Sequence, residues 1–181
     1  ILQTEYSLCV LCCAEAIRYP EKVAEYSVKL ISASSPWYKF KFISNTTNRL
    51  FDSFWKKEIS SFIDEFEVNI IHVHDLYMLP PAVEAAKHLG IPIIADLHEN
   101  YPAAFQTYSW TSGFPHRLFV NYNHWSEIES SYLQEADGVI VLSDQYREFL
   151  MQKHPNLKKD SFAVYPNVPD LDFFDYTSET I

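Results

Sequence analysis

The chain alternates between short, mainly apolar runs and longer segments in which apolar residues recur every three or four positions. Apolar runs of about 4–8 residues that are bounded by polar or turn-forming residues are typical of buried strands. The runs of this kind are Ser7–Cys13, Tyr26–Ile31, Val68–Val73, Ile91–Leu97, Gly138–Leu142 and Phe162–Tyr165. We therefore predict a strand in each of them.

Segments with apolar residues at helical spacing separate the later runs. The clearest helix is Leu50–Phe66, whose apolar residues are Phe51, Phe54, Trp55, Ile59, Phe62, Ile63 and Phe66. The next helix begins at Pro80 and Pro81 and ends at Gly90, because proline suits a first turn and glycine a helix end. Its predicted apolar face consists of Ala82, Val83, Ala85, Ala86 and Leu89.

Two further helices complete the pattern. The apolar spacing predicts a long one over His116–Ala136, and Ser143 is a good N-cap for another. The stretches Pro36–Asn48 and His98–Gly113 have no regular period and are predicted to be irregular.

Alternating strands and helices, with strands that are apolar on both faces, indicate an α/β fold. We expect a Rossmann-like, doubly wound parallel sheet with helices on both faces. A length of 181 residues fits one domain. We assign residues 1–165 to this domain and residues 166–181 to a linker.

Composition narrows the function. A net charge of −10 argues against nucleic acid as the main partner. No apolar run approaches the ~18–20 residues of a membrane span, and the clustered Cys9, Cys12 and Cys13 fit reduced thiols in the cytoplasm. With only three glycines, the chain cannot form a glycine-rich phosphate loop, so we do not expect it to hold a nucleotide diphosphate unaided.

Polar residues follow each of four successive predicted strands. They are His74 and Asp75, then His98 and Glu99, then Ser143, then Asn167. In open parallel sheets, ligands bind beyond the carboxyl ends of the strands. These side chains therefore mark one edge of the sheet as the candidate site.

Three stretches of the sequence resemble the family 4 (group 1) glycosyltransferases. They are IIHVHDLYMLPPAVEAAKHLGIPIIADLHENYP from Ile70, IESSYLQEADGVIVLSDQYREFL from Ile128, and VYPNVPD from Val164, in the order that the family has them. The resemblance implies the GT-B fold, in which two Rossmann-like domains face a cleft, and this chain resembles the N-terminal, acceptor-side domain. It also implies retaining transfer of a sugar from a nucleotide sugar to a sugar or lipid-linked acceptor, in glycan or glycolipid synthesis.

The resemblance also assigns residues. His98 matches the family histidine close to the donor sugar, and we expect it to be catalytic. Ser143 caps a helix whose N–H groups face the cleft, and Asn167 matches an asparagine near the domain crossing, although its turn here reads Asn-Val-Pro-Asp. We add four residues to the substrate site: His74, Asp75, Glu99 and Tyr101. Asp75 could orient His74 or an acceptor hydroxyl, or equally stabilise the turn, and Glu99 and Tyr101 are expected to shape the loop.

Compared with the family pattern, we expect two parts to lie outside this sequence. They are the first strand with its glycine-containing loop and the donor-binding C-terminal domain. We therefore expect the nucleotide sugar to bind mainly through a C-terminal domain, no cofactor beyond that co-substrate, and no activity in this chain alone.

Two alternatives stay open. His72 and His74 share one face of a strand, and with Asp75, His98 and Glu99 they could hold zinc or iron in a hydrolase. A non-catalytic, partner-binding α/β domain is the other alternative. Because the histidines match a metal-free family pattern, we predict no tightly bound metal.

The segment 36–57 differs from its surroundings. It combines five basic residues and one acidic residue with seven aromatic residues. Such a mixture suits peripheral contact with a membrane surface, although the aromatic residues could equally pack on the sheet while the lysines extend into water. Glu129, among apolar neighbours on its helix, is expected to be solvated or paired with backbone.

Overall fold

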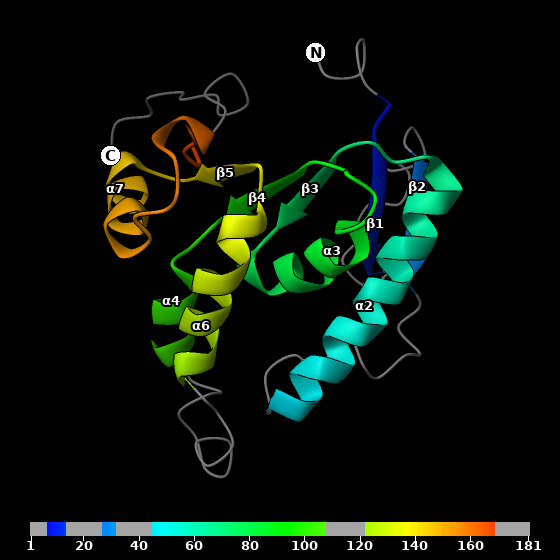
Figure 1. The fold of residues 1–181 in the computed structure, drawn as a ribbon, viewed down its shortest axis with the longest axis horizontal. Helices are drawn as coiled ribbons and strands as arrows, with labels where there is room; N and C mark the ends of the chain where they lie inside the picture. Colours follow the sequence, from blue (N-terminus) through cyan, green and yellow to red (C-terminus); the bar gives the residue numbers. More distant parts are fainter. Residues whose placement is uncertain (1–6, 14–26, 32–44, 108–121, 169–181) are drawn as a thin grey trace, which may run out of the picture.

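In the computed structural model, which describes residues 7–13, 27–31, 45–107 and 122–168, parallel strands pack against a layer of helices (Figure 1). The strands are β1 (Cys9–Cys13), β2 (Ser27–Ile31), β3 (Ile71–His74), β4 (Ile93–Leu97), β5 (Gly138–Val141) and β6 (Phe162–Val164). The α-helices are α2 (Asn45–Phe66), α3 (Leu79–Ala86), α4 (Tyr101–Thr107), α6 (Tyr122–Tyr132) and α7 (Asp144–Lys153). The single 3₁₀ turns are η4 (Leu76–Met78), η6 (Leu133–Glu135) and η7 (Lys159–Ser161).

The strands form two parallel sheets among the described residues. β1 pairs with β2, and the larger sheet has the order β3-β4-β5-β6. In the larger sheet His74 lies beside Asp96, and Leu97 lies beside Val141. Because all four strands run the same way, their carboxyl ends meet at one edge. A parallel sheet with helices around it confirms the predicted α/β, Rossmann-like class.

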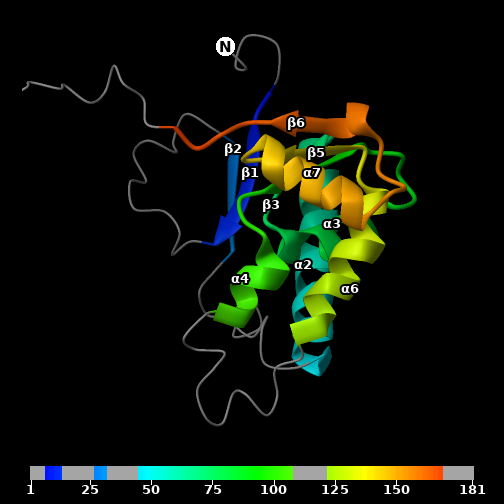
Figure 2. The same cartoon turned by 90° about the vertical axis from the view of Figure 1, so that its left-hand side faces the viewer.

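The helices α2, α3 and α6 lie side by side along the sheet (Figures 1 and 2). Helix α2 is amphipathic, as its sequence predicts, and its apolar stripe is buried against the sheet and α3. The buried residues of this stripe are Phe51, Trp55, Ile59, Phe62 and Ile63. All of them except Phe62 join residues of β3, β4, β5, α3, α4, α6 and α7 in one hydrophobic core cluster.

Helix α2 is longer than its sequence pattern predicts. It begins at Asn45, so the prediction of irregular structure is wrong for residues 45–48, and residues 36–44 lie outside the described part. The helix ends in a left-handed residue, Glu67, with φ of 51°. The amide of Val68 then donates to the carbonyl of Ile63 at 3.2 Å, which closes the helix end. Strand β3 therefore starts at Ile71 rather than at Val68.

Helix α3 begins with prolines, as predicted, but it ends at Ala86. A turn follows, and Gly90 adopts a φ of 66° that favours glycine. Leu89 lies in this turn and is 54% exposed, so its predicted place on the buried face is wrong.

The stretch after β4 contains a helix that the sequence analysis missed. Helix α4 occupies part of the predicted loop His98–Gly113. Helix α6 follows and gives way to η6 before β5. The predicted start of the long helix at His116 and the linker residues 169–181 lie outside the described residues. No helix in the described ranges is long and apolar enough to cross a membrane.

Candidate functional site

The carboxyl ends of β3 and β4 bring three histidines and two aspartates together. Side chains alternate between the faces of a strand, so His72 and His74 of β3 project to the same face. Asp96 is the registered neighbour of His74 and therefore shares that face, as does His98 two residues later. The apolar residues between them face the helical layer. We call His72, His74, Asp75, Asp96 and His98 the histidine cluster.

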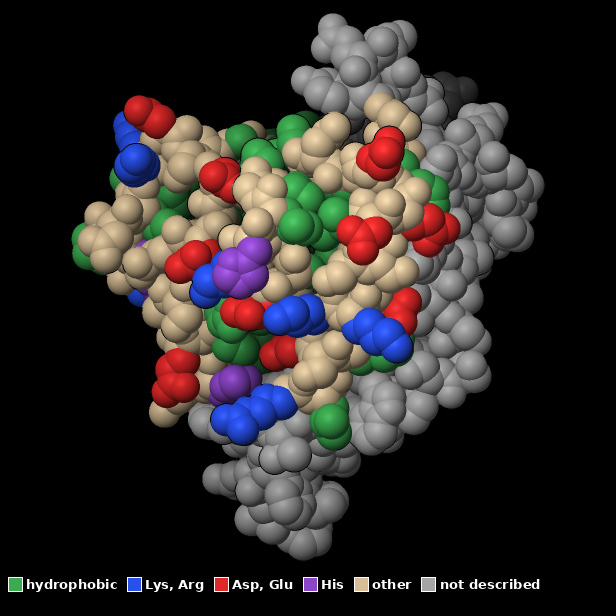
Figure 3. Space-filling model, turned by 45° about the vertical axis from the view of Figure 1, so that its right-hand side comes forward, with side chains coloured by type: hydrophobic (Ala, Val, Ile, Leu, Met, Phe, Trp, Pro, Cys, Tyr) green, Lys and Arg blue, Asp and Glu red, His purple; other side chains and the backbone are tan. Residues whose placement is uncertain are grey.

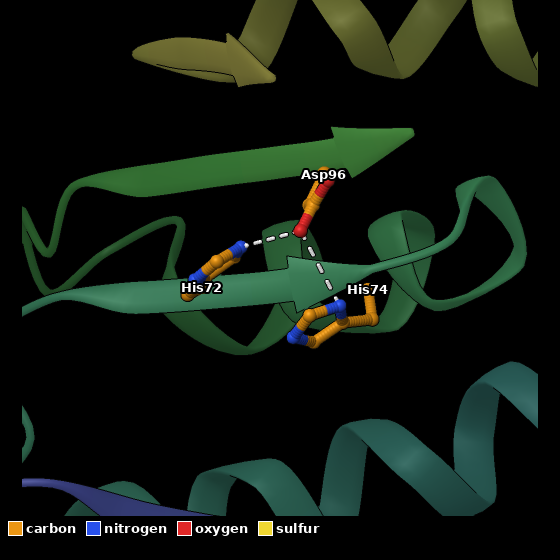
Figure 4. A group of neighbouring side chains, drawn as sticks. All are labelled: His72, His74 and Asp96. Atoms are coloured by element: carbon orange, nitrogen blue, oxygen red, sulfur yellow. Dashed lines mark hydrogen bonds and ion pairs between the residues drawn. The ribbon is translucent and has the colours of Figure 1, made fainter. Parts of the chain in front are cut away.

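Asp96 lies at the centre of the histidine cluster. Its Oδ2 is 3.0 Å from Nε2 of His72, 3.4 Å from Nδ1 of His74 and 3.3 Å from Nε2 of His98. Both contacts drawn in Figure 4 lead to the same carboxylate oxygen. The carboxylate is buried while the imidazoles are partly exposed. One buried carboxylate oxygen therefore contacts three rings that solvent can reach.

The rings also contact one another. His72 and His74 stack with a centroid distance of 4.7 Å, and Nδ1 of His74 lies 3.3 Å from Nε2 of His98. Partial burial lowers the pKa of His74, and the positive charge that His72 and His98 would carry lowers it further. Asp96 and Asp75 oppose this shift. A lowered pKa favours the neutral imidazole, which can accept as well as donate a hydrogen bond.

Asp75 connects β3 to η4 in an unusual backbone conformation. Its φ of 69° and ψ of 147° lie in a region that residues with a Cβ rarely adopt. Its amide donates to the carbonyl of Asp96 at 2.9 Å, which continues the pairing of β3 with β4. Its carboxylate lies 3.7 Å from Nδ1 of His98. Asp75 thus faces Nδ1 of His98, whereas Asp96 contacts Nε2 on the other side of the ring.

The next strand end adds a second group of contacts. The side chain of Ser143 accepts a hydrogen bond from the amide of Tyr146 at 3.2 Å, which confirms Ser143 as the N-cap of α7. The hydroxyl of Tyr146 donates to the carbonyl of Glu99 at 3.1 Å. These bonds tie the first turn of α7 to the segment that follows His98. Glu99 is therefore placed next to the histidine cluster through its backbone.

The remaining predicted site residues lie apart from the histidine cluster. The ring of Tyr101 is buried at the start of α4 and packs edge-on against Trp125 with a centroid distance of 4.9 Å. That position makes it part of the aromatic core. Asn167 is exposed and follows β6, two strands away from β4 in the sheet. The structure thus brings together His74, Asp75 and His98, with Glu99 and Ser143 beside them.

The sequence analysis did not identify Asp96. The residue stands inside an apolar run, Ile91–Leu97, that was interpreted only as a buried strand. A single carboxylate inside such a run is itself a signal, because a buried charge needs partners. His72, which the sequence analysis considered as a metal ligand, lies within hydrogen-bond distance of Asp96.

A second buried carboxylate lies between α6 and α7. Glu129 is fully buried, and its Oε1 accepts from Nζ of Lys153 and lies 2.8 Å from Nε2 of His154. The expectation of a solvated or backbone-paired Glu129 is therefore wrong, because α7 supplies side-chain partners. The pKa of Tyr146 is raised, first by burial and second by the charge of Glu129. This pairing fixes α7 to α6 and so supports the second group of contacts.

A shallow cavity of about 220 Å³ lies elsewhere in the described part of the chain. Its lining includes Val83, Gly90, Ile93 and Asp137, from the start of β4 and the residues around it. The amide of Ile93 donates to the carboxylate of Asp137 at 2.9 Å, so that carboxylate already has a structural partner. The cavity is at the opposite edge of the sheet from the histidine cluster, and its lining also includes Lys87 and Glu135.

Comparison with protein families settles the relationship. The sequence profile of Glycosyltransferase Family 4 matches residues 7–173. The chain belongs to Glycosyltransferase Family 4. Membership in Glycosyltransferase Family 4 supports a glycosyltransferase-like function. The match includes both sheets and every strand end of the candidate site.

Comparisons with curated proteins and with solved structures add less to this assignment. No curated protein matches the chain significantly. Among solved structures, UDP-N-acetylglucosamine 2-epimerase from Rickettsia bellii is similar at a TM-score of 0.46 and 12% sequence identity. That alignment covers 87% of this Glycosyltransferase Family 4 chain and 44% of the epimerase. The chain therefore spans less than half the length of that structure.

Proposed function

We propose that this chain supplies the acceptor-side, N-terminal half of a retaining glycosyltransferase that moves a sugar from a nucleotide sugar to an acceptor. The supporting observation is the placement of the histidine cluster at the carboxyl edge of a parallel sheet, in a chain that belongs to Glycosyltransferase Family 4. Ligands of open α/β sheets bind beyond this edge.

In the proposed reaction, the bond between the anomeric carbon and the leaving phosphate oxygen breaks, and its electron pair stays with that oxygen. The acceptor hydroxyl forms the new bond on the same face of the sugar, and its proton passes to the departing phosphate. No side chain of the protein becomes covalently attached. The protein contributes positioning and electrostatic stabilisation of developing charge.

His98 is the catalytic residue of this proposal. Its ring is 42% exposed at the edge of the sheet, so a substrate can reach it. Asp96 and Asp75 face its two ring nitrogens and act as positioning residues. His74 lies within 3.3 Å of the same ring and can bind an acceptor or donor hydroxyl beside it. Ser143, Glu99, Tyr101 and Asn167 would shape or line the surrounding edge.

The partners follow from the same proposal. The acceptor is a sugar or a lipid-linked sugar, and the nucleotide of the donor binds mainly to a second domain. We place the reaction in the cytoplasm, with peripheral membrane contact through residues 36–57. Nucleic acid is not a partner in this proposal. The transfer needs no resident metal cofactor.

Substitution of His98 by alanine in the intact enzyme tests the proposal. In a cleft, one well-placed donor near the reacting sugar is worth about 3 kcal/mol, or roughly a hundredfold in kcat/KM. A partly exposed ring contributes little packing, so the free energy of unfolding should fall by only about 1 kcal/mol. The matched control is His88→Ala, which removes an exposed histidine outside the cluster.

The two measurements separate a catalytic from a structural histidine. We expect a large loss of kcat/KM with a small change in Tm for His98→Ala, and no change in either for His88→Ala. Activity within about threefold of wild type, together with a Tm lower by several degrees, would show that His98 only organises its loop.

A metal-dependent hydrolase remains the second candidate, because His72, His74 and Asp96 bring ligand-type atoms together. It predicts that the protein hydrolyses an activated ester or phosphoester only with added zinc. The glycosyltransferase proposal predicts no such hydrolysis with or without zinc.

A further inference from the structure

The histidine cluster has the donor atoms of a metal site as well as those of a hydrogen-bond network. Four atoms converge, and each comes from a different side chain: Nε2 of His72, Nδ1 of His74, Nε2 of His98 and Oδ2 of Asp96. Imidazole and carboxylate groups are the ligands that zinc accepts. The ligand-type atoms of His72, His74 and Asp96 all lie within 4.8 Å of one another.

The separations of the three nitrogens from Asp96 are close to those of tetrahedral coordination, although His98 lies outside the group in which every ligand atom is within 4.8 Å of every other. With zinc–ligand bonds of about 2.0–2.1 Å, neighbouring ligand atoms lie roughly 3.3 Å apart. The three histidine nitrogens are 3.0, 3.4 and 3.3 Å from Oδ2 of Asp96. The separation between His74 and His98 is 3.3 Å. The distances from Oδ2 of Asp96 to the histidine nitrogens are therefore close to the separation that an ion would impose on its ligand atoms.

A second observation concerns the residue behind the ligands. A histidine that binds a metal usually directs its other ring nitrogen at a carboxylate or carbonyl, which fixes the orientation of the ring. Nδ1 of His98 faces the carboxylate of Asp75 at 3.7 Å, on the side of the ring away from Asp96. Asp75 thus lies behind the ring of His98, at a distance slightly longer than a hydrogen bond.

We propose that His72, His74 and Asp96 form an exchangeable binding site for one zinc ion, and that the ring of His98 completes it by turning toward the ion. Three neutral imidazoles and one carboxylate give the ligand set a charge of −1, which only partly balances the ion. The side chains of His72, His74 and His98 are 46%, 60% and 42% exposed. Zinc can therefore enter and leave without any opening of the core.

Exposure also reconciles the site with the expectation from sequence. The family resemblance predicts no tightly bound metal, and an open site on the sheet surface fits reversible binding rather than a permanent cofactor. The proposal concerns binding to this chain and does not depend on glycosyl transfer. If transfer occurs, a bound ion would occupy the ring nitrogens that His74 and His98 offer to a sugar.

The test uses the tag-free chain, zinc chloride in titration calorimetry, and Co²⁺ as an absorption probe of geometry. We expect one saturable site, with the intense visible bands of tetrahedral cobalt. The variants His72→Ala and His74→Ala should each weaken zinc binding by at least about tenfold, because even the loss of an outer-shell partner of a ligand costs about 10–100-fold. His88→Ala, at an exposed histidine outside the cluster, should bind like wild type.

Circular dichroism of every variant establishes that it is folded before binding is compared. His74→Ala is the decisive variant, because its side chain is the most exposed of the three and its loss leaves the core intact. Absence of saturable binding in wild type, or equal weakening in His74→Ala and His88→Ala, would overturn the proposal. Either result would leave the cluster as a hydrogen-bond network alone.

Discussion

Single residues of the histidine cluster decide what this edge of the sheet can do. Asp96 is the clearest case, because one buried oxygen has three imidazole neighbours. The sequence predicted His74, Asp75 and His98 at this edge, since residues that follow parallel strands share an edge. It did not predict Asp96, because whether His74 and Asp96 are neighbours depends on the register between β3 and β4. Register is set by pairing across the sheet rather than by local sequence.

Asp75 combines a place in the cluster with a strained backbone. We predict that Asp75→Gly gives a higher free energy of unfolding than Asp75→Ala by about 1 kcal/mol or more. Both variants remove the carboxylate, but only glycine adopts a φ near 69° without strain. Urea denaturation of the two variants measures the difference. Equal stability would show that the backbone at residue 75 relaxes when its side chain is lost.

Asp52 makes stability depend on pH. Burial first, and the nearby charge of Glu84 second, raise its pKa to about 7, compared with about 4 in the unfolded chain. The folded state therefore holds this proton more tightly, and the resulting stabilisation is complete below about pH 4 and disappears as the pH rises through 7. We predict that Asp52→Asn flattens the fall in unfolding free energy between pH 5 and pH 8.

The control for Asp52 lies on the same helix. Asp64 is exposed on α2, so Asp64→Asn should keep the pH dependence of the wild type. Denaturant unfolding at pH 5 and at pH 8 gives both comparisons. If Asp52→Asn and wild type lose stability in parallel over this range, the partly buried carboxyl of Asp52 is not the source of the effect.

At the scale of elements, helix and strand existence was more predictable than their ends. The long apolar stripe of α2 and the proline start of α3 were confirmed, because each depends on local spacing or backbone geometry. The short helix α4 was missed. Its Tyr101 and Phe105 are buried against Trp125, so contacts with a distant helix stabilise a segment too short to show a period.

The end of α2 offers a prediction at this scale. Glu67 adopts a left-handed conformation where glycine is usual, and the bond from Val68 to Ile63 completes the motif. We predict that Glu67→Gly raises the free energy of unfolding by about 1 kcal/mol, because a side chain costs about that much in this region. Thermal and urea unfolding measure the gain.

A glycine placed three residues earlier is the matched control for Glu67→Gly. Asp64 is exposed and helical, so Asp64→Gly should lower the free energy of unfolding by about 0.5–1 kcal/mol. Opposite signs for the two glycine variants support the assigned helix end. A loss of stability in Glu67→Gly would mean that the Glu67 side chain contributes more than its backbone strain costs.

At the scale of the molecule, the surface bears on membrane contact. In the described half of segment 36–57, Phe51 and Trp55 are buried, and Lys56 lies 3.6 Å from Glu84. The face turned to the viewer in Figure 3 carries acidic and basic side chains interspersed rather than separated by sign. These observations favour packing for the described aromatic residues, while residues 36–44 lie outside the described part.

We predict weak, salt-sensitive binding of the chain to anionic vesicles through residues 36–57, because basic and aromatic side chains together suit a lipid surface. Added salt should weaken it, since screening at physiological ionic strength acts over about 8 Å. Co-sedimentation with vesicles compares wild type with the double variant Lys56→Glu, Lys57→Glu. A neutral vesicle serves as control. Equal sedimentation of the two proteins would remove this segment from consideration.

A single hydrophobic core connects most of the described elements. One hydrophobic core cluster includes residues of α2, α3, α4, α6, α7 and strands β3, β4 and β5, and Leu11 of β1 packs against it. A domain held by one core unfolds as a unit, so calorimetry of this 181-residue chain should give a single transition.

The same chain should not transfer sugar by itself. Its cluster rings are exposed by 42% to 60%, so nothing within the described residues excludes water from them or fixes a nucleotide sugar over them. Desolvation and fixed orientation supply much of the catalysis in such reactions, and both need a second surface across the edge. Incubation of the folded chain with a panel of labelled nucleotide sugars and acceptors tests this. Measurable transfer by the isolated chain would mean that the donor site lies within these residues.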